Sequence, residues 1–154
     1  MNILFISNDL IAGNLAYLLK KEGHSVKLYV HSKHQRNNLD YLVEKTNNWK
    51  KELPWVGKDG LIIFDDVGFG KDQDRLRKKG YTVYGGNSLS DELEDKRQKT
   101  QEIFKEYGVN VKDIIDFNNV YEALEYVIAN PKAWVVKQNG LAPKSLNYVG
   151  EFDD

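Results

Sequence analysis

Four polar residues of this chain directly follow apolar runs that are typical of buried β-strands. Asn8 and Asp9 come just after residues 3–6, and Asp65 and Asp66 come directly after residues 61–64. In parallel α/β sheets the carboxyl ends of the strands form the usual ligand-binding edge. We therefore predict that these four residues bind a small-molecule substrate. The two aspartates could instead bind a metal ion, accept a phosphoryl group or cap the following helix, and of these three the cap is the interpretation we favour.

Two lysines form a second candidate site. Lys96 lies early in a predicted long helix, and Lys137 ends the apolar run at residues 134–136. A lysine at such a position can neutralise a polyphosphate as a point charge. Taken singly, either lysine is best explained as a solvated surface charge. Together, in a helix–strand–helix–strand order, they suggest binding of a nucleotide.

Familiar nucleotide-binding signatures are incomplete. Gly68 and Gly70 match the first two glycines of a dinucleotide fingerprint, but Gln73 stands in place of the third. The chain also has no Walker A sequence. Classical NAD binding and P-loop hydrolysis are therefore disfavoured, and the two glycines are expected to serve the turn itself.

Residues 1–88 have the pattern of a Rossmann-like parallel sheet. Apolar runs predict strands at residues 3–6, 25–30, 61–64 and 81–84, with charged or amphipathic helices between them. The first helix is expected to bury the side formed by Ile11, Leu15, Leu18 and Leu19. A short helix is expected around residues 39–43, and the basic stretch at 75–79 is expected to be a solvated helix face. Alternation of strands with helices predicts the α/β fold class.

Residues 89–154 have a different pattern, and we place a domain boundary near residue 88. A long helix is predicted from Ser90, its expected N-cap, to Gly108. A strand over 111–117, a helix capped by Asn118 and a strand over 134–137 follow. The small number of elements predicts that this domain is incomplete. A unit of about 66 residues is also only marginally stable on its own.

Composition limits the classes of function. The 154 residues include 22 Lys and Arg against 23 Asp and Glu, so no basic excess favours nucleic acid as the partner. The absence of cysteine excludes disulfides, thiolate zinc sites and cysteine nucleophiles. No apolar run approaches the roughly 20 residues of a membrane span. A cytoplasmic protein that binds small molecules, with neither a nucleic-acid nor a membrane partner, is the expectation.

The chain resembles the N-terminal third of ATP-grasp ligases, most closely the phosphoribosylamine–glycine ligase family. Residues 1–88 resemble the Rossmann-like pre-ATP-grasp domain of the family, and residues 89–154 resemble a linking helix and the beginning of the ATP-grasp domain. Gly85 to Ser88 stand where the family has a glycine-proline-serine turn. The most specific likeness is to the family's Val-Val-Lys-Ala-Asp-Gly-Leu-Ala, and it lies in Val135-Val136-Lys137-Gln138-Asn139-Gly140-Leu141-Ala142.

This resemblance implies an ATP-dependent carboxylate–amine ligase of purine synthesis, acting through an acyl phosphate. ATP and magnesium are the implied cofactors, with the metal ligands expected outside this chain. Lys96 and Lys137 match lysines that contact the ATP phosphates, and Lys144 is aligned with the lysine of a phosphate-covering loop. The substrates would be a nucleotide, an amino acid and an amine similar to phosphoribosylamine.

Two segments depart from the family pattern. The family's glycine-rich phosphate loop is replaced by Pro143-Lys144-Ser145-Leu146, and its glycine-rich first loop with Arg-Glu-His is replaced by Ser7-Asn8-Asp9. The 154-residue chain alone is expected to be inactive. Two alternatives are a receiver-like signalling module, with Asp9, Asp65 and Asp66 near strand ends, and a degenerate ATP-grasp relative that binds a partner protein.

Overall fold

Two compact units make up the chain, Met1–Glu92 and Leu93–Asp154. The computed structural model describes residues 1–138, 145 and 147–151. Lys144 and residues 139–142 of the lysine motif therefore lie outside the described residues. The assignment of residues 1–88 to a pre-ATP-grasp domain and of 89–154 to the start of an ATP-grasp domain stays a prediction.

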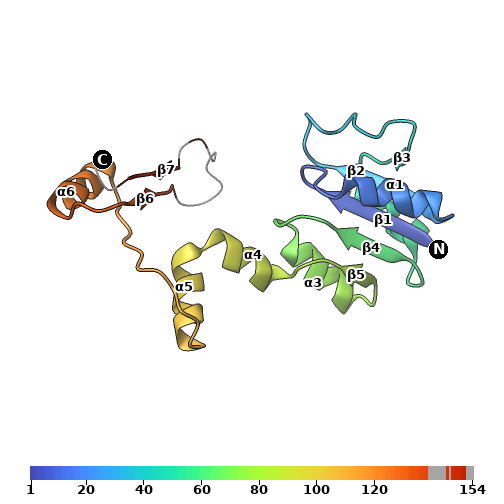
Figure 1. Cartoon of the computed structure of the whole chain (residues 1–154). Helices are drawn as coiled ribbons and strands as arrows, with labels where there is room; N and C mark the ends of the chain where they lie inside the picture. Colours follow the sequence, from blue (N-terminus) through green and yellow to red (C-terminus); the bar gives the residue numbers. More distant parts are fainter. Residues whose placement is uncertain (139–144, 146, 152–154) are drawn as a thin grey trace. The chain divides into compact units, whose positions relative to one another are not determined.

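The first unit is built on a five-stranded parallel sheet, which confirms the predicted α/β fold class (Figure 1). Its strand order is β3-β2-β1-β4-β5. The strands are β1 (Asn2–Ser7), β2 (Ser25–Val30), β3 (Glu44–Lys45), β4 (Leu61–Phe64) and β5 (Thr82–Tyr84). The chain moves outward from β1 through β2 to β3 and then returns to the other side of β1. The strand order therefore reverses between β1 and β4.

Helices cover both faces of this sheet. Helix α1 (Gly13–Lys21) packs on the face that carries Ile3 and Phe5 of β1. The opposite face, with Leu4 and Ile6, is covered by the 3₁₀ helix η1 (Trp49–Glu52), by α2 (Leu53–Val56) and by α3 (Gly70–Lys78). These four apolar side chains of β1 are at most 1% exposed, because the strand lies between two layers of helices.

Helix α1 buries a different side from the one predicted. Gly13 and Ala16 are buried, whereas Ile11, Leu15 and Leu18 are 69%, 41% and 45% exposed. Two small residues on the sheet side let the helix backbone approach the strands closely. The leucine periodicity therefore indicates the helix correctly, but of the four residues predicted to be buried only Leu19 packs against the core.

Residues 33–42 form turns, so the short helix predicted around residues 39–43 is wrong. Leu39 and Tyr41 have φ angles of 65° and 68°, which a right-handed helix does not contain. Only Val43 of this segment packs as a fully buried residue, and β3 follows it.

The predicted long helix is divided in two. Helix α4 (Ser88–Asp95) ends before Lys96, and α5 (Arg97–Glu106) begins after it. Lys96 itself has φ −108° and ψ 79°, which is outside the helical region. The hydroxyl of Thr100 in α5 contacts the carbonyl oxygens of Leu93 and Lys96, so side-chain hydrogen bonding accompanies the break.

The second unit has little buried surface among its described residues. It contains α5, α6 (Val120–Ala129) and an antiparallel pair of β6 (Val135–Val136) with β7 (Tyr148–Val149). Tyr126 of α6 contacts the rings of Phe117 and Trp134, at centroid distances of 5.5 and 5.7 Å. The buried apolar residues of the described chain all lie between Ile3 and Leu76.

Two sequence predictions in this unit differ from the structure. Residues 111–117 are not a strand, and Ile114 and Ile115 there remain 42% and 40% exposed. A strand requires a neighbour for its backbone hydrogen bonds, and β6 pairs with β7 instead. Asn119 rather than Asn118 caps α6, with its side-chain oxygen accepting from the Glu122 N–H at 2.9 Å.

A search for helices able to cross a membrane finds none among the described residues.

Gly85, directly after β5, is expected to tolerate no side chain. Its φ is +146°, and an added Cβ would contact the Gln73 Oε1 atom and lie 3.1 Å from the Phe64 Cβ atom. Gly80 is the matched control, since its φ is +79° but nothing lies within 4 Å of an added Cβ. We expect Gly80→Ala to lower the free energy of unfolding by about 1–2 kcal/mol and Gly85→Ala to lower it by about 1–3 kcal/mol more. Urea denaturation measures both, and equal losses would contradict the close packing at Gly85.

Candidate functional site

The edge of the sheet between β1 and β4 is the candidate site. In doubly wound sheets, ligands bind beyond the carboxyl ends of the strands at the point where the strand order reverses. Here that point lies between Ser7 at the end of β1 and Phe64 at the end of β4. Residues 8–12 and 65–69 lead from these strand ends into α1 and α3. The structure therefore brings the predicted loops together in the first unit.

Asp65 connects the two loops. Its Oδ2 atom accepts hydrogen bonds from the Ser7 hydroxyl at 3.0 Å and from the Ala12 N–H at 2.8 Å. The Ser7 Oγ atom in turn accepts from the Leu10 N–H at 2.6 Å. Leu10 has a φ of +61°, so this hydrogen bond helps to hold an unfavourable backbone conformation at the start of α1.

Burial raises the pKa of Asp65 above its ordinary value. Desolvation is the main cause, and the nearby negative charge of Asp66 adds to it. The hydrogen bonds from Ala12 and Ser7 act in the opposite direction without cancelling the effect. The Oδ1 atom of Asp65 is buried and has no hydrogen-bond partner among the described residues.

The other predicted substrate-binding residues have different environments. The Asn8 Nδ2 atom donates to the Val67 carbonyl oxygen at 2.6 Å, which is a second link between the loops. The Asp66 Oδ1 atom accepts from the Val67 N–H at 2.8 Å. Asp9 is exposed. That any of these residues binds a substrate stays a prediction.

The predicted cap of the next helix is made by a different residue. Asp65 and Asp66 precede α3, yet the N–H of Gly70, its first residue, donates to Asp91 Oδ2 at 2.6 Å. Asp65 instead accepts from Ala12, which is the N-cap position of α1. Asp65 follows β4, yet it caps α1, the helix that follows the neighbouring strand β1. It does not cap α3, the helix that follows β4.

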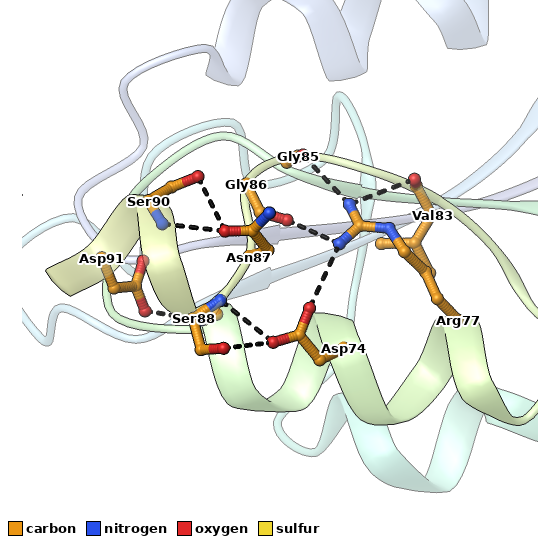
Figure 2. Close-up of polar contacts among 10 residues, drawn as sticks. Asp74, Arg77, Val83, Gly85, Gly86, Asn87, Ser88, Ser90 and Asp91 are labelled. Atoms are coloured by element: carbon orange, nitrogen blue, oxygen red, sulfur yellow. Dashed lines mark hydrogen bonds and ion pairs between the residues drawn. The ribbon is translucent and has the colours of Figure 1, made fainter. Parts of the chain in front are cut away.

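A polar network joins α3 to the turn before α4 (Figure 2). The Arg77 guanidinium donates to the carbonyl oxygens of Gly86 at 2.6 Å, Gly85 at 3.0 Å and Val83 at 3.4 Å. Arg77 was predicted to be part of a solvated face. Its actual role is to satisfy carbonyl groups of a turn, which sequence spacing does not reveal.

Asp74 completes this network from the same helix. It accepts from the Ser88 N–H at 3.0 Å and also from the Ser88 hydroxyl. These hydrogen bonds lower the pKa of Asp74 below its ordinary value. Asn87 caps α4 by accepting from the Ser90 N–H at 2.8 Å, so the predicted cap at Ser90 is wrong by three residues.

Gly70 is required by close backbone packing. A Cβ at Gly70 would lie 2.5 Å from the Asn87 carbonyl carbon and 2.6 Å from the Ser88 nitrogen. Gln73 stands at the third position of the glycine pattern and is fully buried. Its side-chain amide has no hydrogen-bond partner among the described residues. Gly70 thus serves close packing, and Gly68 serves the turn with a φ of +93°.

The two lysines of the second candidate site lie in the second unit. Lys96 occupies the break between α4 and α5, and Lys137 directly follows β6. Both residues are exposed. A surface hollow of this unit is lined by α5 and residues 112–116, and neither lysine contributes to it. Within the described parts of the chain, no group of three or more His, Asp or Glu side chains could hold a metal ion.

Comparison with known proteins reveals a similarity to a curated ligase. Phosphoribosylamine–glycine ligase of Lactococcus lactis subsp. lactis (strain IL1403) is 29% identical over 103 residues. The matched region is 67% of this chain but only 24% of that ligase. The chain matches no protein-family model.

Solved structures share the fold over nearly the whole chain. N5-carboxyaminoimidazole synthetase from Staphylococcus aureus in complex with ADP aligns with a TM-score of 0.65 and 17% identity. The alignment covers 97% of this chain and 41% of the synthetase. A second structure of the synthetase gives a TM-score of 0.64 and 18% identity, covering 96% and 40%.

The chain is similar in sequence to this ligase and in fold to this synthetase. The matched length is about a quarter of the curated ligase and two fifths of the solved synthetases. These comparisons confirm the resemblance of the sequence to ATP-grasp ligases.

The pH dependence of stability tests the environment of Asp65. Because burial raises its folded-state pKa above 3.8, ionisation of Asp65 destabilises the fold. We expect its contribution to the free energy of unfolding to decrease as the pH rises from 3.8 through the folded-state pKa. Urea denaturation of wild type and Asp65→Asn at several pH values should therefore show the wild type losing stability relative to the variant over that range.

Asp74→Asn provides the contrast, because the folded-state pKa of Asp74 is lowered. The stabilising contribution of Asp74 is present above pH 3.8 and is lost as the pH falls through its folded-state value. The two variants should thus show opposite trends with pH. The same trend for both would contradict the assignment of Asp65.

Proposed function

We propose that this chain is the N-terminal part of an ATP-dependent carboxylate–amine ligase related to phosphoribosylamine–glycine ligase. The observation that carries the proposal is the 29% identity to that ligase over two thirds of the chain. The shared fold with N5-carboxyaminoimidazole synthetase, solved with ADP, supports it. The ligase would act in purine synthesis, in the cytoplasm, and would use ATP with magnesium.

The proposed reaction has two steps. An oxygen of the amino acid carboxylate attacks the γ-phosphorus of ATP, which forms an acyl phosphate and releases ADP. The amine nitrogen then attacks the acyl carbon, the C–N bond forms, phosphate leaves and the amine loses a proton. Charge accumulates on the transferring phosphoryl group, so fixed cations near it lower the barrier.

Lys96, Lys137 and Lys144 are the residues proposed to bind the ATP phosphates. Lys137 directly follows β6, and the pairing of β6 with β7 gives its backbone a defined position. Lys96 is held at the break between two helices by the hydrogen bonds of Thr100 to Leu93 and Lys96. An exposed ammonium group on such a fixed backbone position can neutralise a phosphate without a large desolvation cost.

The second unit has the features of part of a larger domain. Both strands of the β6–β7 pair are exposed, and α6 has no buried residue. Val120, Leu124 and Ile128 of α6 are 72%, 55% and 70% exposed. We infer that the magnesium ligands and the rest of the ATP site belong to the larger domain of which this unit is a part.

The receiver-like alternative is not supported by the environment of Asp65. Phosphorylation of Asp65 would require its carboxylate to be accessible, yet Oδ2 is engaged by Ser7 and Ala12 and Oδ1 is buried. Treatment with acetyl phosphate is therefore expected to leave Asp65 unmodified.

Titration with ATP and magnesium tests the phosphate-binding role of Lys137. A charge-assisted hydrogen bond contributes about 1.5–3 kcal/mol, so Lys137→Ala should weaken binding by roughly tenfold or more. Lys51→Ala is the control, because Lys51 is an exposed lysine of η1 in the first unit. Isothermal titration calorimetry should show weaker binding only for Lys137→Ala. Equal affinities for both variants would favour the degenerate relative that binds a partner protein.

The 154-residue chain alone is expected to release no phosphate from ATP in the presence of magnesium and glycine. The physical reason is that its described residues contain no cluster of three or more His, Asp or Glu side chains able to hold the metal. A coupled assay for inorganic phosphate measures this, and turnover by the isolated chain would refute the proposal that it is one part of the enzyme.

A further inference from the structure

The edge of the sheet between β1 and β4 has backbone N–H groups of the kind that commonly bind phosphate. Helices α1 and α3 both begin at this edge, and helix N-termini favour anions. The amine implied by the proposed function carries a phosphate group. This edge is therefore where a phosphate would be expected.

Side chains of the protein itself accept from one N–H group at the start of each helix and from one N–H group of each preceding loop. Ala12 at the start of α1 donates to Asp65, and Gly70 at the start of α3 donates to Asp91. The Leu10 N–H donates to Ser7, and the Val67 N–H donates to Asp66. Three of these four acceptors are carboxylates, so the position of an anion is taken at both helices.

Neither carboxylate could be displaced by phosphate without further cost. Asp65 is also held by the Ser7 hydroxyl, and Asn8 joins the same two loops. Asp91 belongs to α4, which is joined to α3 through the hydrogen bonds of Ser88 to Asp74. A phosphate at either helix would also lie next to a negative charge, and like charges at short range repel.

We propose that Asp65 and Asp91 are specificity-determining residues that exclude phosphate from the edge between β1 and β4. The amine substrate held at this edge is accordingly one without a phosphate group there. The Oδ1 atom of Asp65 is buried, so this carboxylate offers no open position for an anion. That the bound amine is a substrate rests on the proposed ligase function. The exclusion of phosphate does not depend on that function.

Binding of ribose 5-phosphate tests the proposal, with ribose as the probe that lacks phosphate. Backbone amide NMR of the full chain at low ionic strength would follow the Ala12 and Gly70 signals. For wild type we expect no phosphate-dependent shift at either residue. Asp91→Asn should produce such a shift at Gly70, and Asp65→Asn should produce one at Ala12, each with at least tenfold tighter binding than wild type.

Asp59→Asn is the matched control, because it removes one negative charge at the opposite edge of the sheet, just before β4. This variant should behave as wild type. Phosphate-dependent shifts in the wild type would overturn the proposal, and so would variants that fold but still bind no phosphate. If Asp65→Asn does not fold, Asp91→Asn alone decides the outcome.

The readout is separate from the test of ATP binding. ATP titration reports on Lys137 in the second unit, whereas these amides belong to the first unit. A chain that binds no ATP but excludes phosphate as described would refute the ligase proposal and leave the exclusion supported. Phosphate binding at Ala12 by a chain that also binds ATP would refute the exclusion and leave the ligase proposal supported.

Discussion

The parallel pairing of β1 with both β2 and β4 is the constraint on which the candidate site depends. β1 is buried on both faces, and its position in the middle of the sheet makes the strand order reverse beside it. That reversal brings residues 8–12 next to residues 65–69, although more than fifty positions separate them in the sequence. Asp65 then connects the two loops through Ser7 and Ala12.

The same arrangement explains why the chain differs from a simple nucleotide-binding Rossmann unit. In such a unit, glycines at the first turn leave N–H groups open to phosphate. Here Asp65 and Asp91 accept from the corresponding N–H groups, and Gly70 serves close packing against the Asn87–Ser88 peptide. The first unit is therefore better suited to holding loops in place than to binding a dinucleotide.

The second unit contrasts with the first in what it buries. Its aromatic contacts centre on Tyr126, whereas apolar side chains of α6 and of the β6–β7 pair remain exposed. Lys96 and Lys137, the lysines suggested by the ATP-grasp resemblance, both belong to this unit. The lysines proposed to bind the nucleotide thus belong to a different unit from the loops between β1 and β4.

The sequence by itself determined the α/β class, the strands at 25–30 and 61–64, and the resemblance to ATP-grasp ligases. Buried strands and helices leave local periodic patterns, and the lysine motif is contiguous, so both can be recognised without a structure. The tertiary structure alone decided the buried side of α1, the break at Lys96 and the role of Arg77. It also decided that Asp65 caps α1 rather than α3. These features depend on which segments become neighbours in space, and neighbouring strands such as β1 and β4 leave no local signal of their pairing.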